Sequence, residues 1–287
     1  VGGTGTPRHA PKPDCANLRI QRPIWFAAEK CTGRGHFQTA ERRIAGMKHK
    51  IYAIDSGFIT SVGMYPYDVR CEMLKTAGYD AIMPNLSWKT WEDVPKFLST
   101  PTRHGIDVHG VYFTVDLAMP CDGEYLNKRL NLFDNLPQGS LLSFSIQASY
   151  PDEALRKRRL EQWLSTLLRA AEQTKRTLSL YPHIGLWTET FEDCIKICRQ
   201  NAHPLLKSTF SALQWYAARS KSGLAETLAP NAQLLGDVNL TGVSRNGPCF
   251  GCTTAEVGRG EFDAFALLAI LQTLDYQKAL GVNCWHI

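Results

Sequence analysis

The sequence predicts an α/β protein built as a (β/α)8 TIM barrel that lacks its final helix. Strand-like and helix-like patterns alternate along the chain, which is typical of a parallel sheet with crossover helices. Eight strand patterns and seven helix patterns can be counted, nearly the number in a complete barrel. The segment Ala279–Ile287 follows a helical pattern as a short apolar run and would close the barrel.

The strand patterns are apolar runs of the kind that a parallel sheet buries on both faces. Several end on polar residues, and the carboxyl ends of the strands are where this fold has its active sites. In chain order the predicted strands are Lys50–Asp55, Ala81–Leu86, Asp107–Thr114, Leu141–Gln147, Thr177–Tyr181, Lys207–Leu213, Gln233–Leu240 and Ala279–Trp285.

The helix patterns lie between these strands. The longest begins with Pro151, Asp152 and Glu153, and the helix macrodipole favours acidic side chains at that end. Asp263 is placed to cap the last helix, whose leucines share one face. The predicted helices are Pro66–Ala77, Trp91–His104, Tyr125–Asn135, Pro151–Thr174, Thr190–Asn201, Ser222–Leu228 and Asp263–Tyr276.

The eighth helix of the barrel has no counterpart after the last predicted strand. We expect a truncated sequence to explain this, and the alternative is that part of the N-terminal region covers the same flank. An uncovered face of parallel strands would expose apolar surface.

Composition narrows the class of protein. The 287 residues are 44% hydrophobic and 21% charged, which fits a soluble protein with a large core. No apolar run approaches the ~18 residues of a membrane span, and no signal peptide is evident, so we expect a cytoplasmic protein without a membrane partner. Nine scattered cysteines argue against a disulfide framework, and the single Cys249/Cys252 pair lacks a second ligand pair for zinc.

The net charge of +5 comes from the N-terminal region. Residues 1–50 carry ten Lys or Arg and three Asp or Glu, which leaves 22 basic and 24 acidic side chains for the rest. The predicted barrel is therefore close to neutral, and we expect no nucleic-acid partner.

Two regions follow from this division. Residues 1–46 are rich in Gly, Pro, Arg and Lys and are predicted to be a disordered or non-native extension, whereas 47–287 form the barrel. Met47 directly precedes the first strand pattern, which favours it as the natural start. A native flexible leader is the alternative.

Three segments carry a family resemblance: Leu178–Thr190, with its Tyr-Pro-His sequence, Gly258–Asp263, and Gly281–Ile287. Together they resemble the xylose isomerase-like TIM barrels, the sugar phosphate isomerase/epimerase superfamily, over about residues 48–287. The resemblance implies proton or hydride transfer next to a sugar carbonyl, usually with a divalent metal such as Mn, Mg, Co or Zn.

The metal ligands that the resemblance implies are replaced in this chain. The family usually has Glu after strand five, Asp or His after strand six, His near strand seven and Glu after strand eight. The matching positions here are Tyr181, Gln214 with Ser211, Asn239 and Asn283. Hard divalent cations favour carboxylate oxygens, so we expect a degenerate metal site and name no metal ligand.

The candidate catalytic residues are His183, Asp55 and Asp116. His183 follows the fifth predicted strand and could act as an acid or base near neutral pH. Asp55 and Asp116 follow the first and third strands and are the carboxylate candidates for a base. The alternatives are a loop histidine and aspartates that cap loops.

Other polar and aromatic side chains at predicted strand ends are candidates for binding a sugar by hydrogen bonds and stacking. Arg245, after strand seven, is a candidate for phosphate, as is Arg259. The predicted substrate-binding residues are Tyr181, Asn85, Tyr112, Gln147, Gln214, Asn239, Arg245, Asn283 and Trp285.

The function expected from these residues and the resemblance is isomerisation or epimerisation of a sugar or sugar phosphate, by acid/base proton transfer at the rim. Its partner would be a small molecule, and an oligomer is compatible with the sequence. One alternative is a non-catalytic sugar-binding barrel that has lost its metal carboxylates. A remote alternative is a relative of the AP endonucleases, which need clustered metal ligands and a basic groove.

Overall fold

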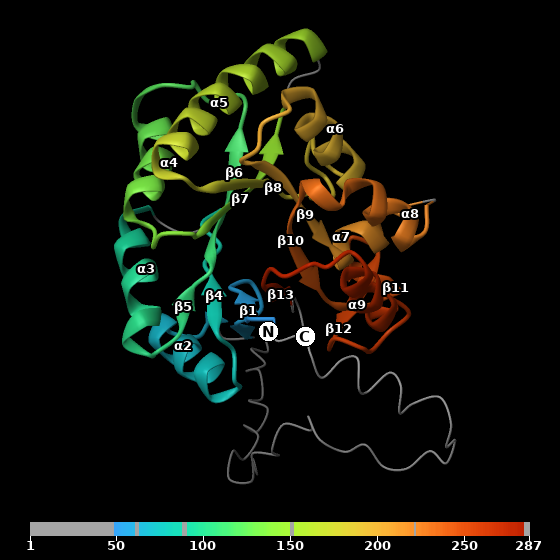
Figure 1. Ribbon diagram of the computed structural model, residues 1–287. Coiled ribbons are helices and arrows are strands. Elements are labelled where there is room, and N and C mark those ends of the chain that lie inside the picture. The colour runs from blue at the N-terminus through green and yellow to red at the C-terminus, as the bar shows by residue number, and fades with distance from the viewer. Residues whose placement is uncertain (1–48, 61–62, 88–90, 150–151, 221, 284–287) are drawn as a thin grey trace, which may run out of the picture. The chain divides into compact units, whose positions relative to one another are not determined.

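The computed structural model describes residues 49–60, 63–87, 91–149, 152–220 and 222–283. Its main sheet has nine parallel strands in the order β5-β4-β1-β13-β10-β9-β8-β7-β6, which wrap into a barrel (Figure 1). The strands are β1 (Ile51–Ile54), β4 (Ala81–Met83), β5 (Asp107–Val108), β6 (Gly110–Asp116), β7 (Leu141–Gln147), β8 (Thr177–Leu180), β9 (Leu206–Ser211), β10 (Leu235–Leu240) and β13 (Leu280–Val282).

The barrel closes at His109, which alone separates β5 from β6. The His109 N–H donates to the Ile82 carbonyl at 3.0 Å, and its carbonyl accepts from Leu141 N–H at 3.0 Å. Asn85 and Tyr112 form a further parallel bridge between the ends of β4 and β6. Since β5 and β6 are two parts of one barrel position, the nine strands occupy eight positions, and the predicted fold class is confirmed.

Helices lie outside the ring of strands (Figure 1). Asp152 accepts from Leu155 N–H at 3.0 Å and Asp263 from Ala266 N–H at 2.8 Å, so the predicted cap at Asp263 is confirmed. The helices are α2 (Tyr67–Thr76), α3 (Val94–Arg103), α4 (Gly123–Asn135), α5 (Glu153–Thr174), α6 (Phe191–Asn201), α7 (Ala212–Ala217), α8 (Leu224–Leu228) and α9 (Ala264–Thr273), with 3₁₀ turns η1 (Trp91–Asp93) and η2 (Ala229–Leu234).

Three apolar clusters are buried, and the alternation of side chains along each strand separates the two that include helix residues from the one inside the barrel. Residues such as Ala53, Phe113 and Phe144 belong to a large cluster shared with buried helix residues, including Trp163 of α5. A separate small cluster lines the interior of the barrel and is rich in tyrosine. Its members are Tyr52, Ile54, Ala81, Met83, Tyr112, Leu141 and Tyr181.

Three local elements differ from the prediction. The predicted strand Lys207–Leu213 ends earlier, because the Ser211 hydroxyl accepts from Gln214 N–H at 3.4 Å and starts α7. After β10 the chain forms a hairpin of β11 (Gly242–Cys249) and β12 (Cys252–Ala255), and after β1 a small one of β2 (Ile59–Thr60) and β3 (Gly63–Met64). A Cβ at Gly247 would lie 2.3 Å from the Cys252 carbonyl oxygen, so this close approach requires glycine.

The predicted extension 1–46 and Trp285 lie outside the described residues. Within the described part of the chain, which stops at Asn283, no helix follows β13. A membrane-crossing helix, one both long and apolar enough, does not occur among these described residues.

Candidate functional site

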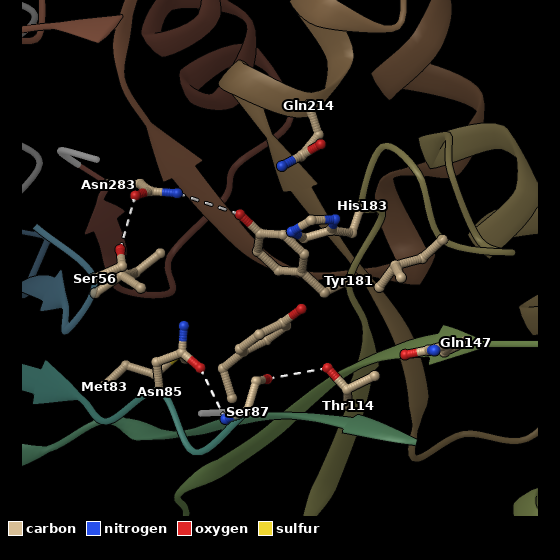
Figure 2. Close-up of a pocket in the computed structure, with 13 residues that line it drawn as sticks. Ser56, Met83, Asn85, Ser87, Thr114, Gln147, Tyr181, His183, Gln214 and Asn283 are labelled. Carbon is tan, nitrogen blue, oxygen red and sulfur yellow. Dashed lines mark hydrogen bonds between the residues drawn. The ribbon is translucent and has the colours of Figure 1, made fainter. Parts of the chain in front are cut away.

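A cavity of about 200 Å³ opens at the carboxyl ends of the barrel strands. This volume lies below the about 300–1,000 Å³ of pockets for drug-sized ligands and suits a smaller molecule. Figure 2 shows the side chains that point into it from strands around the barrel. Seven predicted site residues line it, namely Asn85, Tyr112, Gln147, Tyr181, His183, Gln214 and Asn283.

Two buried tyrosines form the floor of this cavity. The Tyr112 and Tyr181 rings meet edge to face with centroids 5.1 Å apart. The Tyr112 hydroxyl lies 2.8 Å from the Ser145 hydroxyl, and the Tyr181 hydroxyl donates to Ser211 at 3.1 Å. Burial raises the pKa of Tyr112 to about 12 and also raises the pKa of Tyr181, so both phenols are neutral near pH 7.

Asn283 links the last strand to the first at the rim. Its Oδ1 accepts from the Ser56 hydroxyl at 3.2 Å, and its Nδ2 donates to the Tyr181 hydroxyl at 3.5 Å (Figure 2). The side chain is therefore held by partners that follow two different strands, β1 and β8. A neutral amide occupies this position, at which the resemblance implied a metal-binding glutamate.

His183 lies on the loop after β8 and is half-buried. Its Nδ1 is 2.9 Å from the Ile184 carbonyl, which can only accept, so Nδ1 carries a proton and Nε2 of the neutral ring is a base. The Ile184 N–H donates to Gln214 Oε1 at 2.9 Å, which fixes this turn. Burial lowers the pKa of His183, and the Phe250 ring of the β11–β12 hairpin packs edge to face on the imidazole at 5.3 Å.

No carboxylate lines the cavity among the described residues, so His183 is its only group there that titrates near neutral pH. The same residues also contain no cluster of three or more His, Cys, Asp or Glu able to hold a metal ion. One imidazole among neutral amides and hydroxyls is a poor donor set for Mg²⁺ or Mn²⁺. The cavity side chains therefore do not fit the divalent metal that the resemblance implied.

Asp55 and Asp116 do not reach the cavity. Asp55 is fully buried and forms an ion pair with Arg70 of α2, on the outer side of the barrel wall. Asp116 ends β6, and its Oδ1 accepts from the Ala118 N–H at 2.9 Å, as in a loop cap. Successive side chains of a strand point to opposite faces, so Asp55, next to Ile54 of the cavity lining, faces the helices instead of the rim. Asp116 has the same parity as Tyr112 and Thr114, but its carboxylate turns back to the Ala118 N–H. The catalytic roles predicted for these two aspartates are not supported by their positions.

Asn239 is fully buried and belongs to a polar cluster with Tyr52, Asp237 and His109. Its Nδ2 donates to the Tyr52 hydroxyl at 2.7 Å and to Asp237 at 3.3 Å. Tyr52 in turn donates to Asp237 and stacks on His109, whose Nε2 lies 3.6 Å from the carboxylate. The cluster is separate from the cavity lining, so the substrate contact predicted for Asn239 is not supported.

The two candidate phosphate residues are on or near the hairpin. Arg245 is exposed on β11, with its guanidinium 4.6 Å from the centroid of the Tyr216 ring. Arg259 is also exposed and lies 3.7 Å from Glu256. The loop expected after strand seven is this hairpin, so neither arginine lines the cavity.

Sequence reasoning missed the small hydroxyl residues Ser56, Ser87 and Thr114, which also line the cavity. Ser87 and Thr114 hydroxyls lie 3.0 Å apart (Figure 2). Thr114 could have been predicted, because side chains two residues apart on a strand share a face and Tyr112 was already expected to face the cavity. Ser56 and Ser87 lie in loops after the strands, where no pattern indicates direction.

The Tyr52–Asp237 contact gives a stability prediction. We expect Tyr52→Phe to lower the free energy of unfolding by about 1.5–3 kcal/mol, because a carboxylate only 1% exposed loses a charge-assisted hydrogen bond. Urea denaturation measures the loss. Tyr216→Phe is the matched control, since its phenol bonds to the exposed Glu261 and should change stability little. Equal effects of the two substitutions would contradict the role given to Tyr52.

Comparison with known protein families found no matching family model, and no curated protein matched either. Solved structures do match. A xylose isomerase-like TIM barrel protein from Mycobacterium smegmatis, in complex with magnesium, aligns with TM-score 0.61 and 16% identity over 82% of this chain and 90% of its own.

Two other structures give similar scores. A xylose isomerase-like TIM barrel/4-hydroxyphenylpyruvate dioxygenase fusion protein aligns with TM-score 0.61 and 14% identity over 84% of this chain, which spans 39% of the fusion protein. The IOLI protein with a binding zinc atom aligns with TM-score 0.57 and 14% identity over 81% of this chain and 88% of its own. At these identities the likeness shows the fold, and it confirms the resemblance at that level: the chain has the fold of the xylose isomerase-like TIM barrels.

Proposed function

We propose that the cavity at the rim of the barrel binds the uncharged, hydroxyl-rich part of a small molecule of the sugar or polyol class. The observation that carries this proposal is the lining itself, which combines neutral hydrogen-bonding groups with tyrosine rings and contains no carboxylate among the described residues. Amides and hydroxyls both donate and accept, as sugar hydroxyls do, and a neutral site does not favour a charged group over them.

Two side chains supply groups that the protein itself does not use. Asn85 Oδ1 accepts from the Ser87 N–H at 3.0 Å, which fixes the amide and leaves Nδ2 directed into the cavity (Figure 2). The Gln147 amide makes no hydrogen bond to another described residue. Buried or half-buried polar groups of this kind gain most from a ligand that satisfies them.

Isothermal titration with a panel of neutral aldoses, ketoses and polyols tests this function. We expect one of them to bind, and Asn85→Ala to weaken its affinity about fivefold to tenfold, because one hydrogen bond in a water-excluded site is lost. Asn131→Ala, on the exposed face of α4, is the matched control and should not change affinity. Failure of every neutral sugar and polyol to bind, or unchanged affinity in Asn85→Ala, would contradict the proposal.

Proton transfer on the bound sugar is a second candidate function, and it is favoured by the geometry of His183. The hydrogen bond from Nδ1 to Ile184 leaves Nε2 as the basic nitrogen of a cavity-lining ring. A lowered pKa keeps that ring neutral at pH 7 and able to accept a proton. In such an isomerase or epimerase, His183 Nε2 would accept the first proton from the sugar, so a carboxylate in the cavity is not required for that step.

A further inference from the structure

A second pocket of about 490 Å³ adjoins the barrel cavity on the side of α5. Gln147 and Leu186 line both spaces, so a molecule seated in the cavity can extend past them. Figure 2 shows Gln147 at the edge of the cavity, apart from the floor residues. The further lining includes Arg156, Trp187 and Glu189.

Arg156 is the notable group in this second pocket. It belongs to the first turns of α5 and is half-buried, and its guanidinium carbon lies 5.8 Å from the centroid of the Trp187 ring. Its Nε is buried and has no hydrogen-bond partner. No ion pair joins Arg156 to a carboxylate among the described residues.

An arginine in this setting has a clear chemical preference. The Nε atom is shielded, so the groups of the half-buried guanidinium that a ligand in the pocket can reach are its two terminal NH2 groups. Contact with the indole holds the guanidinium in place, and its two terminal NH2 groups can donate two parallel hydrogen bonds to one ligand group. The groups that match this fork are carboxylate and phosphate.

We propose that the Arg156 pocket binds an oxyanion, phosphate or carboxylate, carried by the same ligand whose hydroxyl-rich part lies in the barrel cavity. The substrate class is then a sugar phosphate or a sugar acid. This inference rests on the proposed function, because the anion site gains its selectivity from the neutral cavity beside it. Gln147, at the boundary, contacts the ligand between its two parts.

Glu189 limits the strength of this site. Its carboxylate is exposed but lines the same pocket, so it repels an incoming anion. Replacing Glu189 with glutamine should therefore tighten binding of the anion and leave binding of a neutral sugar unchanged.

The experiment compares three matched probes by isothermal titration: a monosaccharide that binds in the neutral panel, its phosphate ester, and its sugar acid. We expect one or both anions to bind at least about tenfold more tightly than the neutral sugar, and added salt to reduce only this advantage. The Arg156→Gln variant should lose the advantage while it keeps its affinity for the neutral sugar. Arg156→Lys should recover part of it, because a lysine keeps the charge but not the planar fork.

Arg158→Gln is the matched control, since this exposed arginine on the same helix does not line the pocket. Circular dichroism and thermal unfolding establish that each variant is folded. The phosphate ester and the sugar acid distinguish the two oxyanions. Inorganic phosphate alone, titrated into wild type and Arg156→Gln, tests the pocket without a sugar.

The outcomes separate the two proposals. Equal affinity for neutral and anionic probes, or an anion preference that survives Arg156→Gln, overturns the inference and leaves neutral sugar binding intact. Failure of all neutral sugars, together with phosphate binding that depends on Arg156, overturns the proposed function but keeps an oxyanion site at this position.

Discussion

Replacement of His183 with glutamine is expected to slow proton exchange between a bound sugar and solvent by about 100-fold to 10,000-fold, the usual contribution of a positioned acid/base group. The physical reason is that glutamine retains hydrogen bonding but cannot take up a proton. Deuterium incorporation at the carbon next to the sugar carbonyl, followed by NMR in D₂O, measures the rate. The probe is the neutral sugar that binds in the titration panel.

The pH dependence of this exchange has a defined sign. Burial lowers the pKa of His183 below the ordinary 6.5, so Nε2 is unprotonated at neutral pH and exchange should decline only as pH falls through that lowered value. The folded protein also disfavours the imidazolium, so the stability contributed by neutral His183 is present above pH 6.5 and is lost as pH falls.

His104→Gln is the matched control, because this histidine pairs with Asp68 outside the cavity. It should leave exchange unchanged. Exchange at the wild-type rate in His183→Gln would show that His183 is not the base that takes the proton. Absence of exchange in the wild type, with sugar binding retained, would favour the non-catalytic binding barrel.

Replacing Arg70 with methionine is expected to lower the free energy of unfolding by about 3–5 kcal/mol. Arg70 and Asp55 side chains are 7% and 0% exposed, so the substitution removes a cation from a buried carboxylate while it keeps an apolar side chain in place. Urea denaturation measures the change. The same variant should keep its affinity for a neutral sugar, because the ion pair lies on the helix side of β1.

Lys50→Met provides the comparison. The Lys50–Asp107 pair is 70% and 68% exposed, and solvent screening should hold its effect on stability within about 1 kcal/mol. A similar small effect at Arg70 would show that Asp55 does not depend on its partner. Loss of sugar affinity in an Arg70→Met protein that remains stable would indicate that Asp55 contributes to the binding site.

Much of the fold could be predicted because its signals are local. Alternating apolar strands and amphipathic helices indicate a parallel barrel at once, and caps such as Asp263 can be recognised within one turn. The β11–β12 hairpin could not be recognised in this way. Its pairing depends on a tight approach at Gly247 and on cross-strand contacts, in a segment that resembles an ordinary loop.

The candidate site was predicted in outline, since polar residues at strand ends converge in any closed parallel barrel. Seven of the predicted residues do line one cavity, but their functional roles stay predictions. Asp55 and Ser56 show why the outline is incomplete. They are adjacent in sequence, yet Ser56 lines the cavity and Asp55 pairs with Arg70 on the opposite side of the wall.

The sequence by itself determined the barrel class, most strand and helix positions, and the polar residues that follow the strands. All of these depend on residue type and on periods of two or about four along the chain. Only the tertiary structure decided which strand-end groups share the cavity, that Asn239 belongs to a buried cluster with Asp237, and that Arg156 lies beside the cavity. Those facts depend on contacts between residues far apart in sequence, which local periodicity does not contain.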